Sequence, residues 1–216
     1  MLKAVVFDFD GTILDTESPT FHAWQRLYHA HGQVLTFEEY SAAIGADYNA
    51  FDPRRTLEER CGRRLDWERL DAERRSGCLE VICAQSPLPG ISRLLEEAHG
   101  LNLRCAIASS SPSDWVRGHL DRVGLLKRFD FISCAENGCP PKPSPEVYLR
   151  ALRAIAVSAS EALAIEDSPN GVRATQRAGI PCVIVPNQLT RKMRFPEQVR
   201  VLESLDQFSF RDFQTG

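Results

Sequence analysis

The chain has 216 residues, of which 43% are hydrophobic and 25% are charged, so it can bury a sizeable core and shows no sign of disorder. Its formal net charge of -3 gives no electrostatic reason to bind nucleic acid or an anionic membrane. The 7 cysteines form no C-x-x-C pair, which is typical of reduced thiols. We expect neither a signal segment nor a membrane-spanning run, because no stretch of this sequence has the pattern of either. We therefore expect a cytoplasmic protein.

The first predicted element is the apolar run Ala4–Phe7, which is typical of a strand buried on both faces. Asp8, Asp10 and Gly11 follow where that run stops. Two carboxylates held one residue apart repel each other unless a cation or a proton lies between them, and open parallel sheets bind ligands beyond the carboxyl ends of their strands. The stretch therefore predicts a divalent-metal site, with ordinary turn residues as the alternative.

An all-helical insertion is predicted over residues 16–85. After start signals at 16–19, four aromatic and histidine residues recur at helical spacing: Phe21, Trp24, Tyr28 and His31. Three further helices are predicted, at residues 36–43, 52–61 and 66–84. The sequence Ser-Pro-Leu-Pro-Gly at 86–90 marks the downstream boundary.

Beyond this boundary, strands and helices alternate as in a doubly wound α/β fold. Strands are predicted at 103–108, 129–133, 162–165 and 181–185. Helices are predicted at 91–99, 115–123, 145–155 and 171–178. After Val199 one more short strand and a helix are both compatible with the sequence. We therefore expect a Rossmann-like α/β core from residues 1–15 and 86–216, with residues 16–85 inserted after the first strand.

Three later segments also place polar side chains at strand ends. Ser109 opens a run of hydroxyls where the N–H groups of a following helix would favour an anion, although helix capping explains these residues equally well. Lys142 is one of only four lysines and is fixed among prolines just before a helix, which lowers the entropy lost in holding its ammonium group. Glu166 and Asp167 are again acids at the end of a buried strand.

In order, these segments resemble the four motifs of the haloacid dehalogenase-like superfamily of phosphohydrolases. The resemblance implies that Asp8 is a nucleophile that becomes phosphorylated, and that Asp10 is a general acid and base. It also implies that Ser109 and Lys142 bind the phosphoryl group.

The resemblance further implies a Mg²⁺ ion held by Asp8, the carbonyl oxygen of Asp10 and Asp167, with Glu166 holding a metal-bound water. A helical insertion directly after the first motif is similar to the cap of the subgroup that includes β-phosphoglucomutase and phosphoglycolate phosphatase. The expected protein is a Mg-dependent phosphatase that acts on a small phosphorylated metabolite through an aspartyl-phosphate. We expect a monomer, with a dimer as the alternative.

Substrate contacts in this subgroup lie in the loop between cap helices, which predicts specificity residues at Asp47, Tyr48 and Asn49. Arg54 and Arg55 follow this loop, and a solvated helix surface explains them at least as well.

Single residues weigh against other members of the superfamily. A dehalogenase has no use for Asp10, and the insertion contains no lysine for the Schiff base of a phosphonatase. A sugar phosphomutase carries a cap histidine where this chain has Thr20, and it needs a cap group for the second phosphate. A mutase and a non-catalytic phospholigand-binding homologue remain the alternatives, although all four essential residues of the motifs are present.

Overall fold

The computed structural model describes residues 1–44, 51–196 and 199–213. The chain divides into two compact units, one of residues 1–14 and 86–216 and one of residues 15–85. No helix within the described residues is long and apolar enough to cross a membrane.

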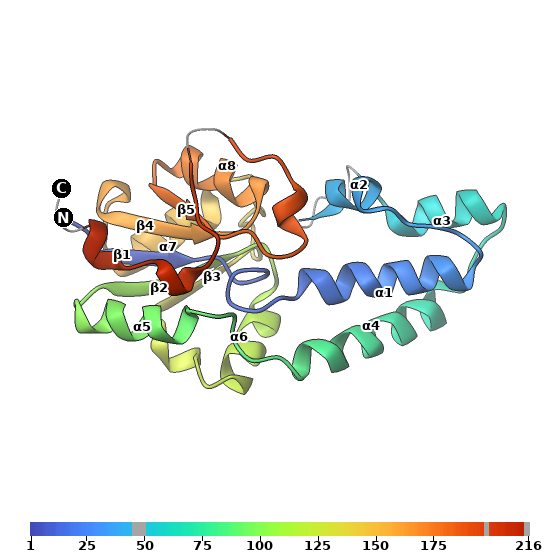
Figure 1. Ribbon diagram of the computed structural model, residues 1–216, viewed down its shortest axis with the longest axis horizontal. Helices are drawn as coiled ribbons and strands as arrows, with labels where there is room; N and C mark the ends of the chain where they lie inside the picture. The colour runs from blue at the N-terminus through green and yellow to red at the C-terminus, as the bar shows by residue number, and fades with distance from the viewer. Residues whose placement is uncertain (45–50, 197–198, 214–216) are drawn as a thin grey trace. The chain divides into compact units, whose positions relative to one another are not determined.

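The first unit is built on a six-stranded sheet in the order β3-β2-β1-β4-β5-β6. The strands are Ala4–Phe7, Arg104–Ser109, Phe131–Cys134, Ala162–Glu166, Cys182–Ile184 and Arg200–Val201, numbered β1 to β6. All neighbouring strands are parallel, and the central strand β1 lies between β2 and β4 (Figure 1). The predicted doubly wound α/β fold is therefore confirmed.

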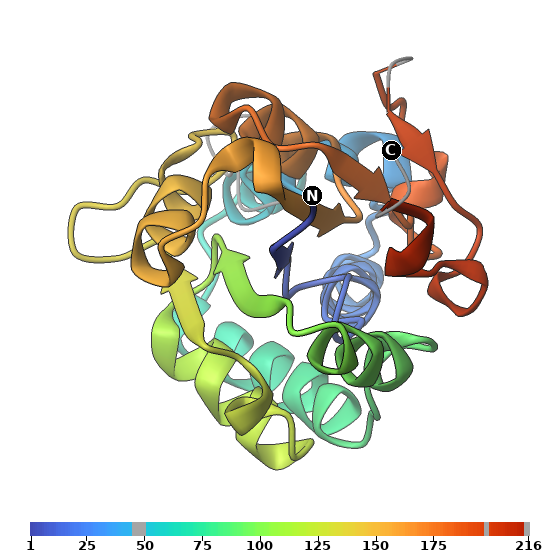
Figure 2. The same cartoon turned by 90° about the vertical axis from the view of Figure 1, so that its left-hand side faces the viewer.

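Helices cover both faces of this sheet (Figure 2). Helices α5 (Ile91–Gly100) and α6 (Ser113–Arg122) share one apolar cluster with Val5 and Phe7. On the opposite face, α7 (Glu146–Ile155) and α8 (Pro169–Ala178) share a second cluster with Ala4 and Val6. Strand β1 alternates between these clusters and is fully buried, which explains why its sequence is apolar at every position.

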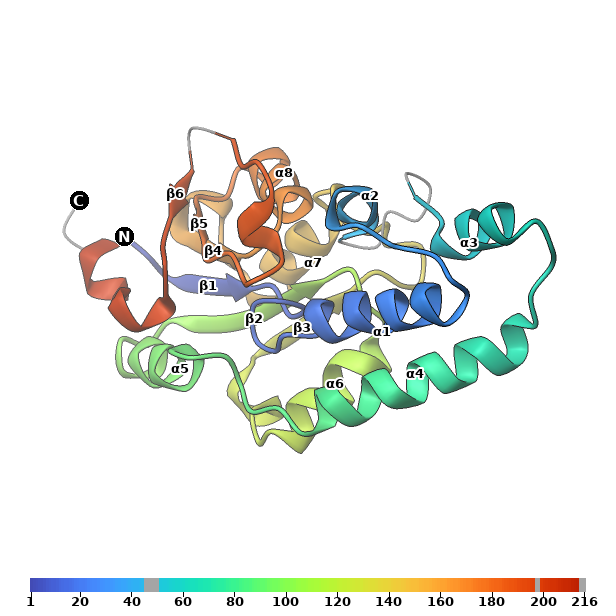
Figure 3. The ribbon, with the colours of Figure 1, turned by 45° about the vertical axis from the view of Figure 1, so that its right-hand side comes forward.

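The described residues of the second unit form helices joined by loops. The helices are α1 (Glu17–Ala30), α2 (Phe37–Tyr40) with a 3-10 turn at Ser41–Ala43, α3 (Pro53–Cys61) and α4 (Trp67–Cys83). Helices α1 and α4 run antiparallel and side by side (Figure 3). Phe21, Trp24 and Tyr28 lie in α1 and are buried, whereas His31, predicted to belong to the same helix, lies beyond its end and is only half-buried.

The C-terminal tail contains the short strand expected after Val199, which is β6. In place of the expected helix, the described residues of the tail form two 3-10 turns, Leu205–Gln207 and Phe210–Phe213. The tail packs against α5 instead of continuing as a helix. An Arg93 amino group donates to the carbonyl oxygens of Leu205 and Phe208, each at 2.6 Å. A Cβ atom at Gly90 would lie 2.7 Å from the Leu205 backbone, so this close approach requires glycine.

Candidate active site

Three carboxylates converge at the carboxyl edge of the sheet. Asp8 follows β1, while Glu166 ends β4 and Asp167 follows it. The register pairs Phe7 with Ile165, so the two strands end side by side. The three residues are at most 6% exposed, and one oxygen of each lies within 4.8 Å of the others. Carboxylate oxygens grouped in this way suit a hard divalent cation.

One buried ammonium group faces these carboxylates. Lys142 lies in the loop before α7, and its Nζ contacts the Asp8 carboxylate and donates to Glu166 Oε1 at 2.7 Å. The hydroxyl of Tyr148 donates to the same Glu166 oxygen at 2.6 Å. Sequence reasoning missed Tyr148, because it is one of several buried residues on one face of α7. Its contact with Glu166 of β4 follows only from the tertiary structure.

Burial raises the pKa of Asp8 to about 7; Lys142 partly offsets this shift, and the charges of Glu166 and Asp10 add to it. Burial also lowers the pKa of Lys142, but its contacts with Asp8 and Glu166 outweigh that effect and raise it overall. Three buried carboxylates lie together here, and the Lys142 ammonium group contacts two of them, Asp8 and Glu166. This excess of negative charge fits a site that binds a divalent cation.

Asp167 is held by residues that follow β5. Asn187 Nδ2 donates to Asp167 Oδ2 at 2.7 Å, and Thr190 Oγ1 lies 3.4 Å from the same oxygen. A Cβ atom at Gly11 would lie 2.3 Å from this oxygen, so glycine is required at that turn, where φ is +86°. Sequence reasoning missed Asn187 and Thr190, although polar residues directly after a predicted strand were a usable signal.

Glu166 is fixed by the turn into α8. Its Oε2 accepts hydrogen bonds from the Asp167 and Ser168 backbone N–H groups at 3.2 and 3.4 Å. Ser168 Oγ lies 3.3 Å from the same oxygen and also accepts the Gly171 N–H, so this residue supports Glu166 and caps the helix. A Cβ atom at Gly171 would lie 1.8 Å from Glu166 Cδ, which leaves no room for a side chain.

The Asp10 carboxylate is bonded by a different set of residues. Ser109 Oγ donates to its Oδ2 at 3.3 Å, and Ser111 Oγ donates to the same oxygen at 2.6 Å. Trp115 Nε1 donates to Oδ1 at 3.0 Å. Ser109 is fully buried, and its predicted contact with a phosphoryl group stays a prediction.

The predicted specificity residues Asp47, Tyr48 and Asn49 lie outside the described residues. Within the helical unit, a cavity of about 260 Å³ is lined by Trp24, Asp52, Pro53, Arg54, Arg74 and Arg75. The Arg74 guanidinium lies 4.1 Å from the centre of the Trp24 ring, and both Arg54 and Arg74 pair with Asp71. The buried Trp24 Nε1 has no hydrogen-bond partner among the described residues.

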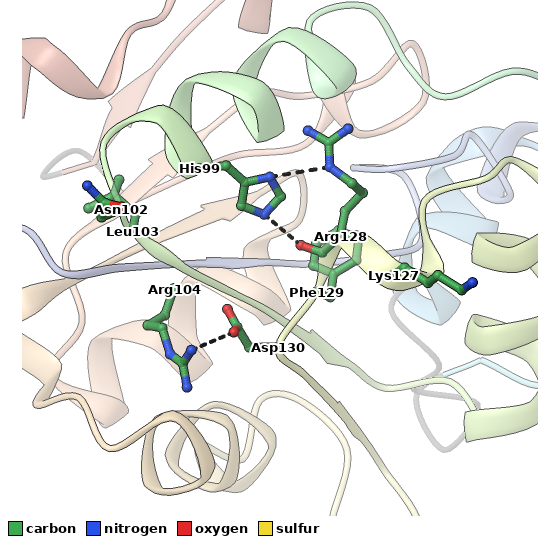
Figure 4. Close-up of a pocket in the computed structure, with 8 residues that line it drawn as sticks. All are labelled: His99, Asn102, Leu103, Arg104, Lys127, Arg128, Phe129 and Asp130. Atoms are coloured by element: carbon green, nitrogen blue, oxygen red, sulfur yellow. Dashed lines mark hydrogen bonds and ion pairs between the residues drawn. The ribbon is translucent and has the colours of Figure 1, made fainter.

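Another cavity, of about 320 Å³, lies in the first unit at the amino ends of β2 and β3 (Figure 4). Its charged groups are largely paired with one another. Arg104 forms an ion pair with Asp130 at 2.8 Å, and Arg128 Nε donates to His99 Nδ1 at 3.3 Å. Lys127 points away from these side chains. The cavity holds no pair of acids and lies at the edge of the sheet opposite Asp8, so it is not the candidate active site.

Comparisons with known proteins give three kinds of match. The haloacid dehalogenase-like hydrolase family matches residues 5–185. YhcW of Bacillus subtilis, named as a phosphatase, is 40% identical over 205 residues, which cover 95% of this chain and 93% of that protein. Validoxylamine A 7'-phosphate phosphatase of Streptomyces hygroscopicus is 28% identical over 85% of each chain. β-Phosphoglucomutase from Clostridium difficile matches with a TM-score of 0.76 and 26% identity over 99% of this chain and 96% of that one.

Proposed function

The chain belongs to the haloacid dehalogenase-like hydrolases and is a phosphatase, and we propose that it hydrolyses a small phosphomonoester through an aspartyl-phosphate on Asp8, with Mg²⁺ as its metal. The observation that supports this proposal best is the buried cluster at the carboxyl edge of the sheet. There Asp8 contacts Lys142, and one Asp8 oxygen lies within 4.8 Å of an oxygen of Glu166 and of Asp167, close enough for one metal ion to bind all three. A nucleophile, a counter-charge and metal ligands are thus combined in one site.

In the first half-reaction, an Asp8 oxygen attacks phosphorus, and the bond between phosphorus and the leaving alcohol oxygen breaks. Asp10, as the carboxylic acid, gives its proton to that leaving oxygen. The Lys142 ammonium and the Ser109 hydroxyl bind the negative phosphoryl oxygens. The alcohol then departs and the phosphoryl group stays on Asp8.

In the second half-reaction, the Asp10 carboxylate takes a proton from a water molecule while the oxygen of that water attacks phosphorus. The bond between phosphorus and the Asp8 oxygen breaks. Inorganic phosphate leaves, Asp8 is restored as a carboxylate, and Asp10 is again protonated for the next turnover.

The residues that would hold Mg²⁺ are Asp8, Asp167 and the backbone carbonyl of Asp10, with Glu166 beside them. Bound there, the ion would neutralise negative charge on the phosphoryl group and on the carboxylates. Their oxygen donors, their burial and the surplus of negative charge support this choice of metal. Asn187 would keep Asp167 turned toward the ion by its hydrogen bond at 2.7 Å.

We assign substrate selection to the helical unit, residues 16–85, acting as a cap. The cavity lined by Trp24, Arg54 and Arg74 supports this assignment, because guanidinium groups form part of its wall. Such a cavity suits a polar or negatively charged part of the substrate. The segment that contains Asp47, Tyr48 and Asn49 stays the predicted source of further contacts.

A sugar phosphomutase is the second candidate, because the chain resembles β-phosphoglucomutase over nearly its whole length. Thr20 stands where a mutase carries a histidine, and its hydroxyl donates to the Thr16 carbonyl at 2.7 Å. This hydroxyl offers no base comparable with an imidazole. Given a sugar monophosphate and a trace of its bisphosphate, the protein is expected to release phosphate, and isomer formation many times faster than phosphate release would favour the mutase.

The direct test is phosphate release from a panel of phosphomonoesters with Mg²⁺, compared between the native chain and Asp8→Asn. We expect turnover by the native chain and none by Asp8→Asn, whose circular dichroism should be unchanged. Substantial turnover by a folded Asp8→Asn variant would rule out the nucleophile, and no turnover by the native chain on any ester would support a non-catalytic homologue.

A further inference from the structure

The Asp10 carboxylate receives hydrogen bonds from one short segment of chain. Ser109 ends β2, and Ser111 and Trp115 follow within the turn and first turn of α6. Both hydroxyls bond Oδ2, at 3.3 and 2.6 Å, whereas the Trp115 indole N–H bonds Oδ1, at 3.0 Å. The two oxygens of Asp10 therefore face partners of different kinds.

Packing fixes the Trp115 ring in this position. Its edge lies against the imidazole of His119, with ring centres 4.3 Å apart and an interplanar angle of 75°. His119 is buried and stacks in turn near Phe9, at 6.4 Å, which is the residue between Asp8 and Asp10. The half-buried indole is thus tied to the same loop whose carboxylate it bonds.

The chemistry of the two kinds of donor differs. An indole N–H can only donate, whereas a serine hydroxyl can donate to a carboxylate or accept from a carboxylic acid. Oδ1 is therefore held by a fixed donor, while the partners of Oδ2 adapt to either form of Asp10. This arrangement fixes the plane of the carboxyl group and leaves Oδ2 as the oxygen able to exchange a proton with the leaving group or with water.

We propose that Trp115 is a positioning residue for Asp10, whose indole N–H orients the carboxyl group so that it can protonate the leaving alcohol. The inference rests on the proposed function, since it takes Asp10 as the acid. Nothing in the sequence pattern separates Trp115 from the apolar residues of α6. Its contact with Asp10 joins two residues that are 105 positions apart in the sequence, so only the tertiary structure shows it.

The test compares two leaving groups in the same variant. An alkoxide needs a proton as it leaves, whereas 2,4-dinitrophenolate departs as a stable anion, and kcat/KM reports the steps through loss of the leaving group. For Trp115→Phe we expect kcat/KM to fall about tenfold or more for the alkyl phosphate turned over fastest in the panel, as for a lost hydrogen bond to a charged group. For 2,4-dinitrophenyl phosphate it should stay within about twofold, since no acid is needed.

Two controls keep the result specific. His99→Phe removes a ring nitrogen that bonds the Arg128 carbonyl oxygen at the edge of the sheet opposite Asp8, and it should leave both values of kcat/KM unchanged. Asp10→Asn should lower kcat/KM for the alkyl phosphate much more than kcat/KM for 2,4-dinitrophenyl phosphate. Because both substrates are measured in one preparation, partial unfolding lowers both values together and cancels from their ratio.

The outcomes separate the two hypotheses. If kcat/KM of Trp115→Phe falls equally for both substrates, or for neither, the positioning role of Trp115 is wrong. In that case a selective loss of kcat/KM for the alkyl phosphate in Asp10→Asn would still support Asp10 as the acid. If Asp10→Asn itself shows no selectivity between the leaving groups, the proposed role of Asp10 fails, and the role of Trp115 fails with it. A selective loss in both variants supports both.

Discussion

Replacing Lys142 with methionine would remove the ammonium group that the structure places between Asp8 and Glu166. Lys142 is 5% exposed, and its Nζ lies 2.7 Å from Glu166 Oε1 and in contact with Asp8. Removing one partner of a buried ion pair leaves uncompensated charge and typically costs about 3–5 kcal/mol of unfolding free energy. With a urea dependence of about 2 kcal/mol per molar, the unfolding midpoint should fall by about 2 M.

The loss should depend on pH. The pKa of Asp8 in the folded chain is raised from 3.8 to about 7, so between these values the folded state binds more protons than the unfolded state. The contribution of Asp8 to stability therefore falls as pH rises through this window. Since Lys142 opposes that shift, the cost of Lys142→Met should be larger at pH 8 than at pH 5.

The assay is urea unfolding of metal-free protein, followed by circular dichroism at both pH values. Lys127→Met is the matched control, because Lys127 is an exposed lysine of the same unit, and its midpoint should equal that of the native chain. Adding Mg²⁺ should recover part of the loss in Lys142→Met, since a cation would replace the missing charge. A midpoint for Lys142→Met equal to that of the native chain at pH 8 would refute the reasoning.

Two further substitutions test the supports of the cluster. Gly171→Ala should abolish turnover, because its Cβ would lie 1.8 Å from Glu166 Cδ. The control is Gly77→Ala, whose Cβ would meet nothing within 4 Å and which should retain the native rate. Native turnover in Gly171→Ala would contradict the predicted clash with Glu166. Asn187→Ala should raise the Mg²⁺ concentration for half-maximal activity about tenfold, because it frees the Asp167 oxygen that Asn187 holds; an unchanged metal titration would exclude this support.

The central part of the site could be predicted because parallel strands place their carboxyl ends at one edge. Once Ala4–Phe7 and Ala162–Ile165 are recognised as buried strands, the acids that follow must lie near each other. The same reasoning cannot place Lys142, whose loop comes from another part of the chain. Only the resemblance to a known family connected that lysine with Asp8.

Other features depend on contacts that no local pattern encodes. Trp115 and Tyr148 occupy helix positions that are typical of packing residues, yet each donates a hydrogen bond to a carboxylate of another segment, 105 and 18 residues away. The tail forms 3-10 turns because Arg93 and the close approach at Gly90 fix its backbone against α5. Such tertiary contacts override weak local preferences for a helix.

A covalent phosphoryl group on Asp8 is the central requirement of the proposed mechanism. The measurement is a rapid acid quench during turnover, followed by mass spectrometry of the peptide that contains Asp8. With 2,4-dinitrophenyl phosphate as the substrate, we expect this peptide to gain one phosphoryl group, and never to gain it in Asp8→Asn. In Asp10→Asn a larger fraction of molecules should carry the group, because this leaving group needs no acid whereas hydrolysis of the aspartyl-phosphate still needs Asp10 as the base. Turnover by the native chain with this peptide unmodified in both the native chain and Asp10→Asn, or a phosphoryl group on the peptide of Asp8→Asn, would contradict the mechanism.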